Sequence, residues 1–240
     1  MMSNRNTENL LFRKQFLPYD IYERHKVVGS LIENGETVVD IGGELNHLSK
    51  FCKPAKLIVA NLKSGDVIIK KNKIPFEKKS FDVVTSIDVL EHIPKSNRRE
   101  FINRLLEVTK KRLILSFPVG TPKHIAYEKK IQNLLKKKGD NVQYLNEHIA
   151  FGLPNITEIG KYSSNHKTKV FYSGNITINE LLFRLFIFDP KVKYFRKFIY
   201  FFKLSFNLIT NPILYHFLTF KNYSDSVNRA YMVIEKNRQY

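Results

Sequence analysis

Apolar residues in the first half of the chain fall into short β-branched runs separated by segments with helical spacing. Residues 37–40 form an extended run that leads directly into the pair Gly42-Gly43. Apolar positions then recur at the spacing of a helix, at Leu45, Leu48 and Phe51. The pattern predicts a strand, a tight glycine turn and a helix. In such units the free N–H groups of the helix start point at a ligand above the turn.

The same alternation continues along the chain and predicts an α/β domain with a mostly parallel sheet. Further strands are predicted at 56–60, 66–69, 81–87, 112–117, 168–172 and 229–235. The first 35 residues have helical character, with Asp20 as the N-cap of a helix that ends at Asn34-Gly35. Other helices are predicted at 96–109, 127–138 and 157–164.

Composition and charge narrow the class of protein. The chain has 240 residues, 43% of them hydrophobic, which suits one folded α/β domain with an insertion. The single cysteine, Cys52, excludes a disulfide framework and fits a reducing compartment. The N-terminus is polar and shows no secretory signal, so we expect a cytoplasmic protein. The net charge of +18 suits nucleic acid, an anionic membrane or phosphorylated substrates, although scattered lysines equally indicate a compositional bias.

The most specific block is residues 74–94, IPFEKKSFDVVTSIDVLEHIP. Its centre, Phe81–Ile87, is rich in apolar and β-branched residues and predicts a buried parallel strand. Asp88–His92 then falls at the carboxyl end of that strand, where open α/β sheets bind ligands. Together with the glycine turn, this block makes residues 36–118 resemble the core of a class I S-adenosylmethionine-dependent methyltransferase, in the branch related to methyltransferase type 11.

The resemblance implies a Rossmann-like, doubly wound sheet of seven strands whose last strand is antiparallel. The cofactor would be S-adenosylmethionine. By the same resemblance, the residues that line its methionine end, its ribose and its sulfonium would be Asp40, Gly42, Gly43, Asn61, Ser86, Ile87 and Asp88. The core would comprise residues 1–173 and 229–240, with 174–228 inserted before the last strand.

Four positions depart from the family pattern. Glu44 and Asn46 replace two glycines, Asn61 replaces the acid that holds the ribose, and Lys70 replaces another acid. Glu44 could crowd the cofactor, whereas Asn46 can still adopt a left-handed conformation. These departures motivate an alternative hypothesis, a binding or scaffold protein that keeps the fold without catalysis.

The insertion is rich in aromatic and basic residues. Residues 183–220 hold 13 of the 31 Phe and Tyr residues, and residues 204–220 carry no charged side chain. A membrane-spanning helix is not expected, because Asn207, Asn211-Pro212 and His216 interrupt this stretch. Its composition suits an interfacial segment on anionic lipid, a helical cap on the core or a homodimer surface. Single-stranded RNA is less favoured, because no RNA-binding module accompanies it.

Methyl transfer requires an acceptor held in line with the methyl group and, where needed, a base that removes its proton. We predict His92, His148 and Glu91 as catalytic residues; His124 is another candidate base, and Glu128 and Glu147 are candidate orienting groups. Glu91-His92 could instead be a helix start, and Glu147-His148 a surface loop. No HExxH motif or Cys-rich cluster occurs, and no metal site is predicted.

Without an Asn-Pro-Pro-Tyr motif, an oxygen acceptor is preferred over a DNA amine. We therefore expect O-methylation of a small or lipid-linked acceptor, such as a glycan hydroxyl or a quinone-like lipid. An RNA methyltransferase remains a third hypothesis, favoured by the net charge of +18.

Overall fold

The computed structural model describes residues 16–70, 73–137, 139, 142–163, 166–188 and 190–236. The helical character expected for residues 1–15 lies outside these ranges, as do the expected helix ends at Lys138 and Ser164.

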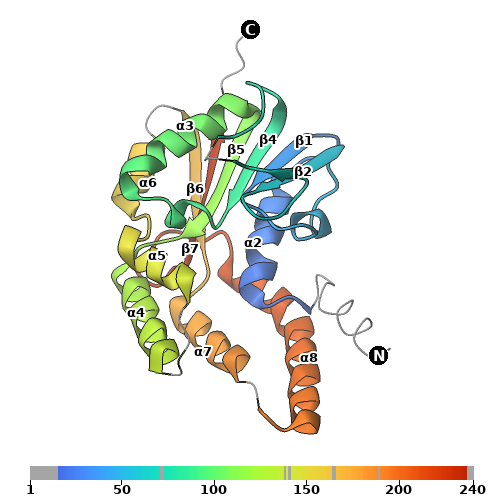
Figure 1. Ribbon diagram of the computed structural model, residues 1–240, viewed down its shortest axis with the longest axis vertical. Coiled ribbons are helices and arrows are strands. Elements are labelled where there is room, and N and C mark those ends of the chain that lie inside the picture. The colour runs from blue at the N-terminus through green and yellow to red at the C-terminus, as the bar shows by residue number, and fades with distance from the viewer. Residues whose placement is uncertain are drawn as a thin grey trace.

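A seven-stranded mixed sheet runs through the centre of the molecule (Figure 1). Its strands are β1 (Thr37–Ile41), β2 (Lys56–Asn61), β3 (Val67–Ile68), β4 (Phe81–Ile87), β5 (Thr109–Pro118), β6 (Lys167–Ser173) and β7 (Arg229–Glu235). The strand order is β3-β2-β1-β4-β5-β7-β6, and β7 is antiparallel to both of its neighbours. The predicted class I architecture is therefore confirmed.

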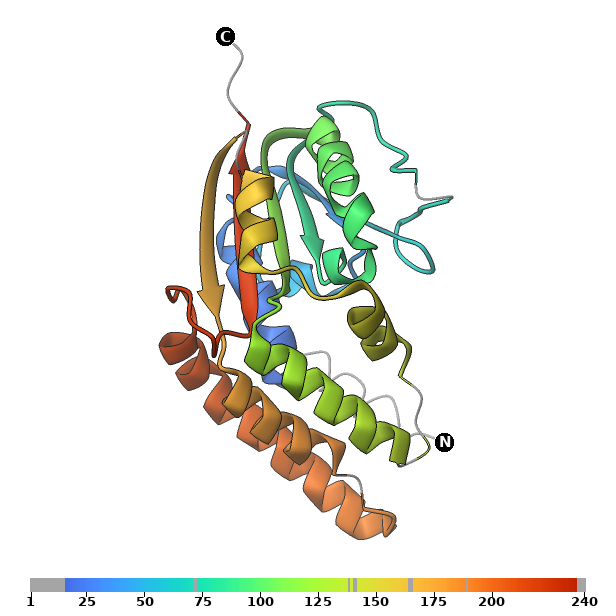
Figure 2. The ribbon, with the colours of Figure 1, turned by 90° about the vertical axis from the view of Figure 1, so that its left-hand side faces the viewer.

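Helices cover both faces of the sheet and close its lower end in Figure 1. They are α2 (Tyr19–Ser30), α3 (Arg98–Val108), α4 (Pro122–Lys137), α5 (Gln143–Phe151), α6 (Ile156–Ser163), α7 (Ile176–Ile187) and α8 (Lys193–Leu218), with 3-10 turns η2 (Leu48–Lys50), η3 (Leu90–His92) and η4 (Lys95–Asn97). Figure 2 shows α3 beside the sheet, and α4, α7 and α8 beneath it.

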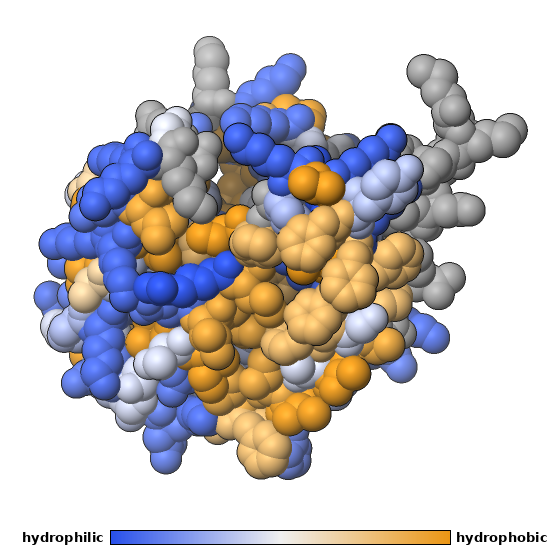
Figure 3. Space-filling model, turned by 90° about the horizontal axis from the view of Figure 1, so that it is seen from below, coloured by the Kyte–Doolittle hydropathy of each residue, from blue (hydrophilic) through white to orange (hydrophobic). Residues whose placement is uncertain are grey.

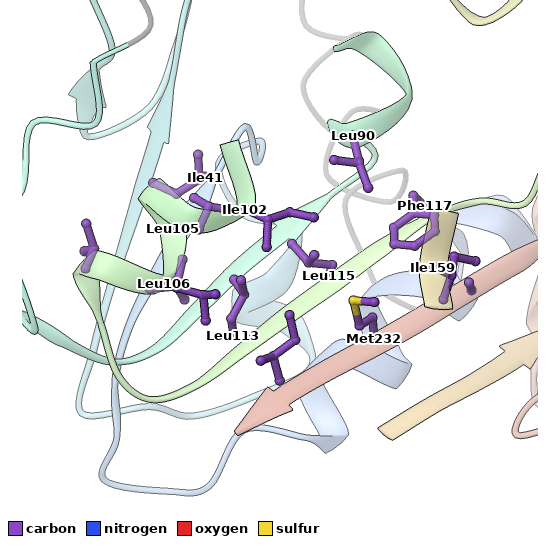
Figure 4. Packing of buried hydrophobic residues seen from close by; sticks show 14 of the residues in the cluster. Ile41, Leu90, Ile102, Leu105, Leu106, Leu113, Leu115, Phe117, Ile159 and Met232 are labelled. Atoms are coloured by element: carbon purple, nitrogen blue, oxygen red, sulfur yellow. The ribbon is translucent and has the colours of Figure 1, made fainter. Parts of the chain in front are cut away.

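The core lies on both faces of the sheet because side chains alternate along each strand. In β7, Met232 packs in a cluster with residues of α3 and α6, whereas Tyr231 packs in a second cluster with residues of α2. Figure 4 shows the first cluster, in which Leu105 from α3 and Ile159 from α6 meet β5 and β7. The strands are therefore fixed from both sides, and their carboxyl ends form a firm base for a site.

Two local expectations are wrong. The first helix begins at Tyr19 after Pro18, so Asp20 lies in its first turn and is not its N-cap. No α-helix follows the glycine turn, where residues 44–50 form turns that include η2. Asn46 has φ of 65°, a left-handed conformation that ends any helix at this point.

The insertion expected at residues 174–228 contains α7 and α8. Asn207 and Asn211 lie within α8, and their buried amides donate hydrogen bonds to the Phe16 carbonyl at 3.0 Å and the Leu17 carbonyl at 2.8 Å. These bonds fasten α8 to the segment that leads into α2. Within the described ranges, every helix is too short or too polar to cross a bilayer.

Candidate active site

The glycine turn follows β1 and is shaped by contacts that exclude any larger residue. A Cβ atom on Gly43 would lie 1.9 Å from Oδ2 of Asp40, and a Cβ on Gly42 would lie 2.2 Å from Cγ2 of Val89. Gly42 also has φ of 85°, which favours glycine. The turn therefore lies directly against the residues that follow β4.

Asp40 is fully buried beside this turn. The parallel register of β1 and β4 places it opposite Thr85, whose hydroxyl donates to Asp40 Oδ1 at 2.7 Å. Oδ2 has no hydrogen-bond partner among the described residues. Burial raises the pKa of the Asp40 carboxyl to about 6. The Asp40 carboxyl therefore packs beneath Gly43 as part of the support of the turn.

Asn61, at the end of β2, braces the turn. Its amide nitrogen donates to the carbonyls of Gly42 at 3.1 Å and Gly43 at 2.8 Å, and its Oδ1 accepts from the Leu62 N–H at 2.6 Å. An aspartate could not make the first two bonds, because a carboxylate does not donate. The ribose contact expected for Asn61 stays a prediction.

The two substituted glycine positions have different outcomes. Asn46 adopts the left-handed conformation that the sequence analysis allowed for it. The Glu44 side chain is 71% exposed and pairs with His47 at 3.3 Å. Glu44 still lines the neighbouring cavity.

Three predicted cofactor residues at the end of β4 have different surroundings. The Ser86 hydroxyl is buried and donates to the Ile41 carbonyl at 3.0 Å, and Ile87 packs in the core. Asp88 has φ of 55° and receives hydrogen bonds from Arg24 and Arg229. Burial raises the pKa of Asp88, but the guanidinium groups of Arg229 and then Arg24 outweigh it and hold that pKa below its ordinary value.

The sequence analysis did not assign a role to Arg24 or Arg229. Arg229 begins β7, is 5% exposed and donates to both Asp88, at 3.2 Å through Nη2, and Ser116, at 3.2 Å. Arg24 lies on α2 and also pairs with Asp20 at 3.7 Å. For Arg229, the sequence offered one signal of a buried role, namely a charged residue at the start of an apolar strand.

The three predicted catalytic residues lie together. Glu91 and His92 come from η3 and His148 from α5, and one ligand-capable atom of each lies within 4.8 Å of the others. The ring centroids of His92 and His148 are 4.8 Å apart. The surface-loop alternative for Glu147-His148 is wrong, because both residues lie in α5 and His148 is buried.

Each histidine is oriented by a carboxylate. His92 Nδ1 is 2.7 Å from Glu147 Oε2, and His148 Nδ1 is 2.7 Å from Glu128 Oε1. His124 Nε2 lies farther from Glu128, at 3.8 Å. The outer ring nitrogens, Nε2, of both histidines are therefore left to face other partners.

Burial dominates the electrostatics of this cluster. It raises the pKa of Glu91 well above the usual range, with the Asp88 carboxylate adding to the effect. It also lowers the pKa of His92, with His148 adding to the effect. Oε2 of Glu91 and Nε2 of His148 are buried, and neither has a hydrogen-bond partner in the part of the chain that the structure describes.

A cavity of about 590 Å³ connects these groups. Asp88, Glu91, His92 and His148 line it from the sheet side, and the apolar residues Leu182, Phe183 and Phe186 of α7 line it from the insertion. Such a cavity has the size of a small-molecule site. The insertion thus contributes a wall of the cavity.

The outer surface of the insertion exposes large apolar side chains. Phe198 is 66% exposed and Ile209 65%, and further exposed residues of α8 are Tyr194, Phe195, Phe201, Phe202, Ile213 and Phe217. Figure 3 shows hydrophobic side chains gathered across this end of the molecule, beside hydrophilic ones. Lys193 and Lys197 are exposed on the same helix, which contains no acidic residue.

Comparison with known proteins agrees with this architecture. Residues 35–117 match the family described as "Methyltransferase domain". No curated protein sequence matches the chain. A phosphoethanolamine N-methyltransferase 2 of Haemonchus contortus, solved with S-adenosyl-L-methionine, has a TM-score of 0.50 at 14% identity, over 96% of this chain and 60% of that one.

A second structure is similar over nearly its whole length. It is a methyltransferase from Thermotoga maritima described as a possible histamine N-methyltransferase, with a TM-score of 0.54 at 12% identity, over 97% of this chain and 95% of that one. At these identities the similarity establishes the fold alone.

Proposed function

We propose that this chain, whose residues 35–117 match the family described as "Methyltransferase domain", uses S-adenosylmethionine to methylate a hydroxyl oxygen of a small or lipid-linked acceptor. The observation that carries this proposal is the pair of carboxylate-oriented histidines, His92 and His148, in a cavity beside the glycine turn. A neutral imidazole so oriented is suited to removing a hydroxyl proton.

The residues at the turn fit the cofactor. Gly42 and Gly43 place no side chain on the turn, so a ligand can approach its backbone, and the buried Asp40 carboxyl packs beneath Gly43. Bound S-adenosylmethionine would supply an activated methyl group. Asp40, Gly42 and Gly43 would hold its methionine end, and Asn61 would act by bracing the turn.

The acceptor side has a polar and an apolar part. The histidines would take the acceptor's proton, while the α7 side chains Leu182, Phe183 and Phe186 would hold an apolar portion of the acceptor. A lipid-linked glycan or a quinone-like lipid combines these two properties.

Labelling with methyl-tritiated S-adenosylmethionine would test this function. The protein would be incubated separately with lipid extract, water-soluble glycans and RNA, with Gly43→Val as the cofactor-binding control. We expect label in the lipid or glycan fraction, as an alkali-stable methyl ether, with the wild type alone. Nuclease-sensitive label in RNA, or no label in any fraction, would contradict the proposal.

We further propose that α8 lies on an anionic membrane surface. Its exposed aromatic side chains and lysines have the composition of an interfacial helix, and no acidic residue of α8 opposes contact with anionic lipid. A protein held there would meet lipid-linked acceptors while remaining cytoplasmic and peripheral. In this arrangement the buried face of α8 would stay packed against the core while its exposed face meets the lipid.

Vesicle cosedimentation would test this second proposal. Phe198 and Ile209 are both exposed and lie eleven positions apart, about three helical turns. We expect the double variant Phe198→Ser, Ile209→Ser to lose most binding to phosphatidylglycerol vesicles, whereas Ile156→Ser on α6, 45% exposed in the wild type, retains it. Equal binding by all variants, or a homodimer that the double variant disrupts, would contradict membrane contact.

A further inference from the structure

Glu91, His92 and His148 form a cluster with the chemistry of a metal centre. Their ligand-capable atoms lie within 4.8 Å of one another, although they come from segments more than fifty residues apart in the sequence. Glu91 is 1% exposed and His148 is 8% exposed. Two imidazoles and one carboxylate are a ligand set that divalent transition metals prefer.

The hydrogen bonds around the cluster leave the metal-facing atoms free. Both histidines use Nδ1 to contact a carboxylate at 2.7 Å, Glu147 for His92 and Glu128 for His148. Carboxylates in this position fix the orientation of metal-binding histidines and make them more basic. The ring nitrogen left for a ligand is then Nε2 in each case.

Two atoms in the cluster have no hydrogen-bond partner among the described residues. They are Nε2 of His148 and Oε2 of Glu91, and both are buried. Leaving buried polar atoms unsatisfied is unfavourable, because they lose their hydrogen bonds to water without replacement. The two atoms do not form a hydrogen bond with each other. A bound cation would instead coordinate both of them at once.

We propose that Glu91, His92 and His148 bind a divalent transition-metal ion whose remaining coordination positions open into the cavity. Asp88 is excluded as a fourth ligand, because Arg24 and Arg229 already occupy its carboxylate. Three protein ligands with open positions are typical of catalytic and not structural metal sites. The metal site deepens the proposed function and rests on it only for the role of the ion. With the ion bound, His92 and His148 act as its ligands and not as bases, so the ion takes over from them the task of promoting loss of the acceptor's proton.

That role is to bind the acceptor's oxygen. A hydroxyl on a divalent cation loses its proton more readily, and an acceptor with two adjacent oxygens, such as a vicinal diol or catechol, would chelate the ion. The proton passes to water, the acceptor oxygen forms its bond to the methyl carbon, and the bond from that carbon to the sulfonium sulfur breaks.

Metal binding can be measured without cofactor or acceptor. Protein treated with a chelator and then dialysed would be titrated with Co²⁺, followed by visible absorption, and with Zn²⁺ and Mn²⁺ by calorimetry. We expect one ion per chain and visible Co²⁺ bands. We expect His148→Asn and Glu91→Gln to abolish the site, and Glu147→Gln to weaken binding by about 10–100-fold.

His124→Asn is the matched control, because His124 is buried and lines the same cavity but lies outside the three-residue cluster. It should leave Co²⁺ binding within about twofold of the wild type, and circular dichroism would confirm that each variant is folded. Absent binding in the wild type, or equal binding in His148→Asn, Glu91→Gln and His124→Asn, would overturn the metal site. Stoichiometric metal binding without methyl transfer would instead contradict the proposed function alone.

Discussion

The glycine turn and the histidine cluster are built differently. On the glycine-turn side, residues close in sequence or on adjacent strands hold one another, as Asn61 holds the carbonyls of Gly42 and Gly43. On the histidine side, the contacting residues are far apart in sequence: Glu128 orients His148, and Glu147 orients His92. The turn side is consequently determined by backbone shape, and the histidine side by charge and by the packing of α4 and α5.

Arg229 lies between the two sides, and its removal should have the largest effect on stability. Arg229→Met would leave Asp88, whose side chain is 23% exposed, with Arg24 as its remaining cation. Loss of one partner from a fully buried ion pair costs about 3–5 kcal/mol, and the partial exposure of Asp88 and the remaining Arg24 place the expected cost at about 3 kcal/mol. Urea unfolding should show a decrease of this size, whereas Arg104→Met, at an exposed pair with Glu100, should change stability by at most about 0.5 kcal/mol. Equally small changes in the unfolding free energy of both variants would mean that the interaction of Arg229 with Asp88 does not stabilise the fold.

Asp40 should make the turn side sensitive to pH. Its pKa rises from an ordinary value of 3.8 to about 6 on folding, so between these values the folded protein binds more protons than the unfolded chain. Its contribution therefore lowers stability by roughly 2–3 kcal/mol as pH rises from about 4 to 6, and is constant above that. The difference in unfolding free energy between wild type and Asp40→Asn should follow this curve. A pH-independent difference would refute the burial account.

Gly43→Ala tests the shape of the turn. The added Cβ would meet the buried Asp40 carboxylate at 1.9 Å, so we expect a loss of about 1–3 kcal/mol in stability and much weaker cofactor binding. Gly160→Ala is the control, because a Cβ at that position in α6 meets nothing within 4 Å. Thermal unfolding would report both. An unchanged Gly43→Ala variant would show that the turn relaxes freely.

Asn61→Asp should have the smallest effect and distinguishes two accounts of this position. If Asn61 is a degenerate ribose ligand, the aspartate restores cofactor affinity. If Asn61 braces the turn, the variant loses two hydrogen bonds, and the free energy of unfolding decreases by about 1 kcal/mol for each. Cofactor affinity then falls as well. Calorimetric titration with S-adenosylhomocysteine should show the decrease, and tighter binding would refute the bracing role.

The limits of sequence prediction follow the same division between the two sides. The bounds of β4 and β7 were predicted correctly because each is rich in apolar residues and the sheet buries nearly all of its positions. The helix after the glycine turn was predicted wrongly because Asn46 adopts a left-handed conformation that its neighbours in sequence do not reveal.

The histidine cluster was predicted only as a set of candidates. Residue type identified His92, His148, Glu128 and Glu147, but not which carboxylate faces which histidine. The role of Arg229 was missed, because a buried arginine is recognised only from the partner that the fold brings to it. Such pairings depend on the tertiary path of the chain, which local patterns do not encode.

Calorimetric titration of the purified wild type with S-adenosylmethionine and S-adenosylhomocysteine would test the central claim most directly. The claim is that the altered glycine turn still forms a cofactor site beside the histidine cluster. We predict binding at micromolar concentration, lost in Gly43→Ala and retained in Gly160→Ala. No detectable binding at millimolar cofactor would contradict the claim and favour a scaffold that keeps the fold without the chemistry.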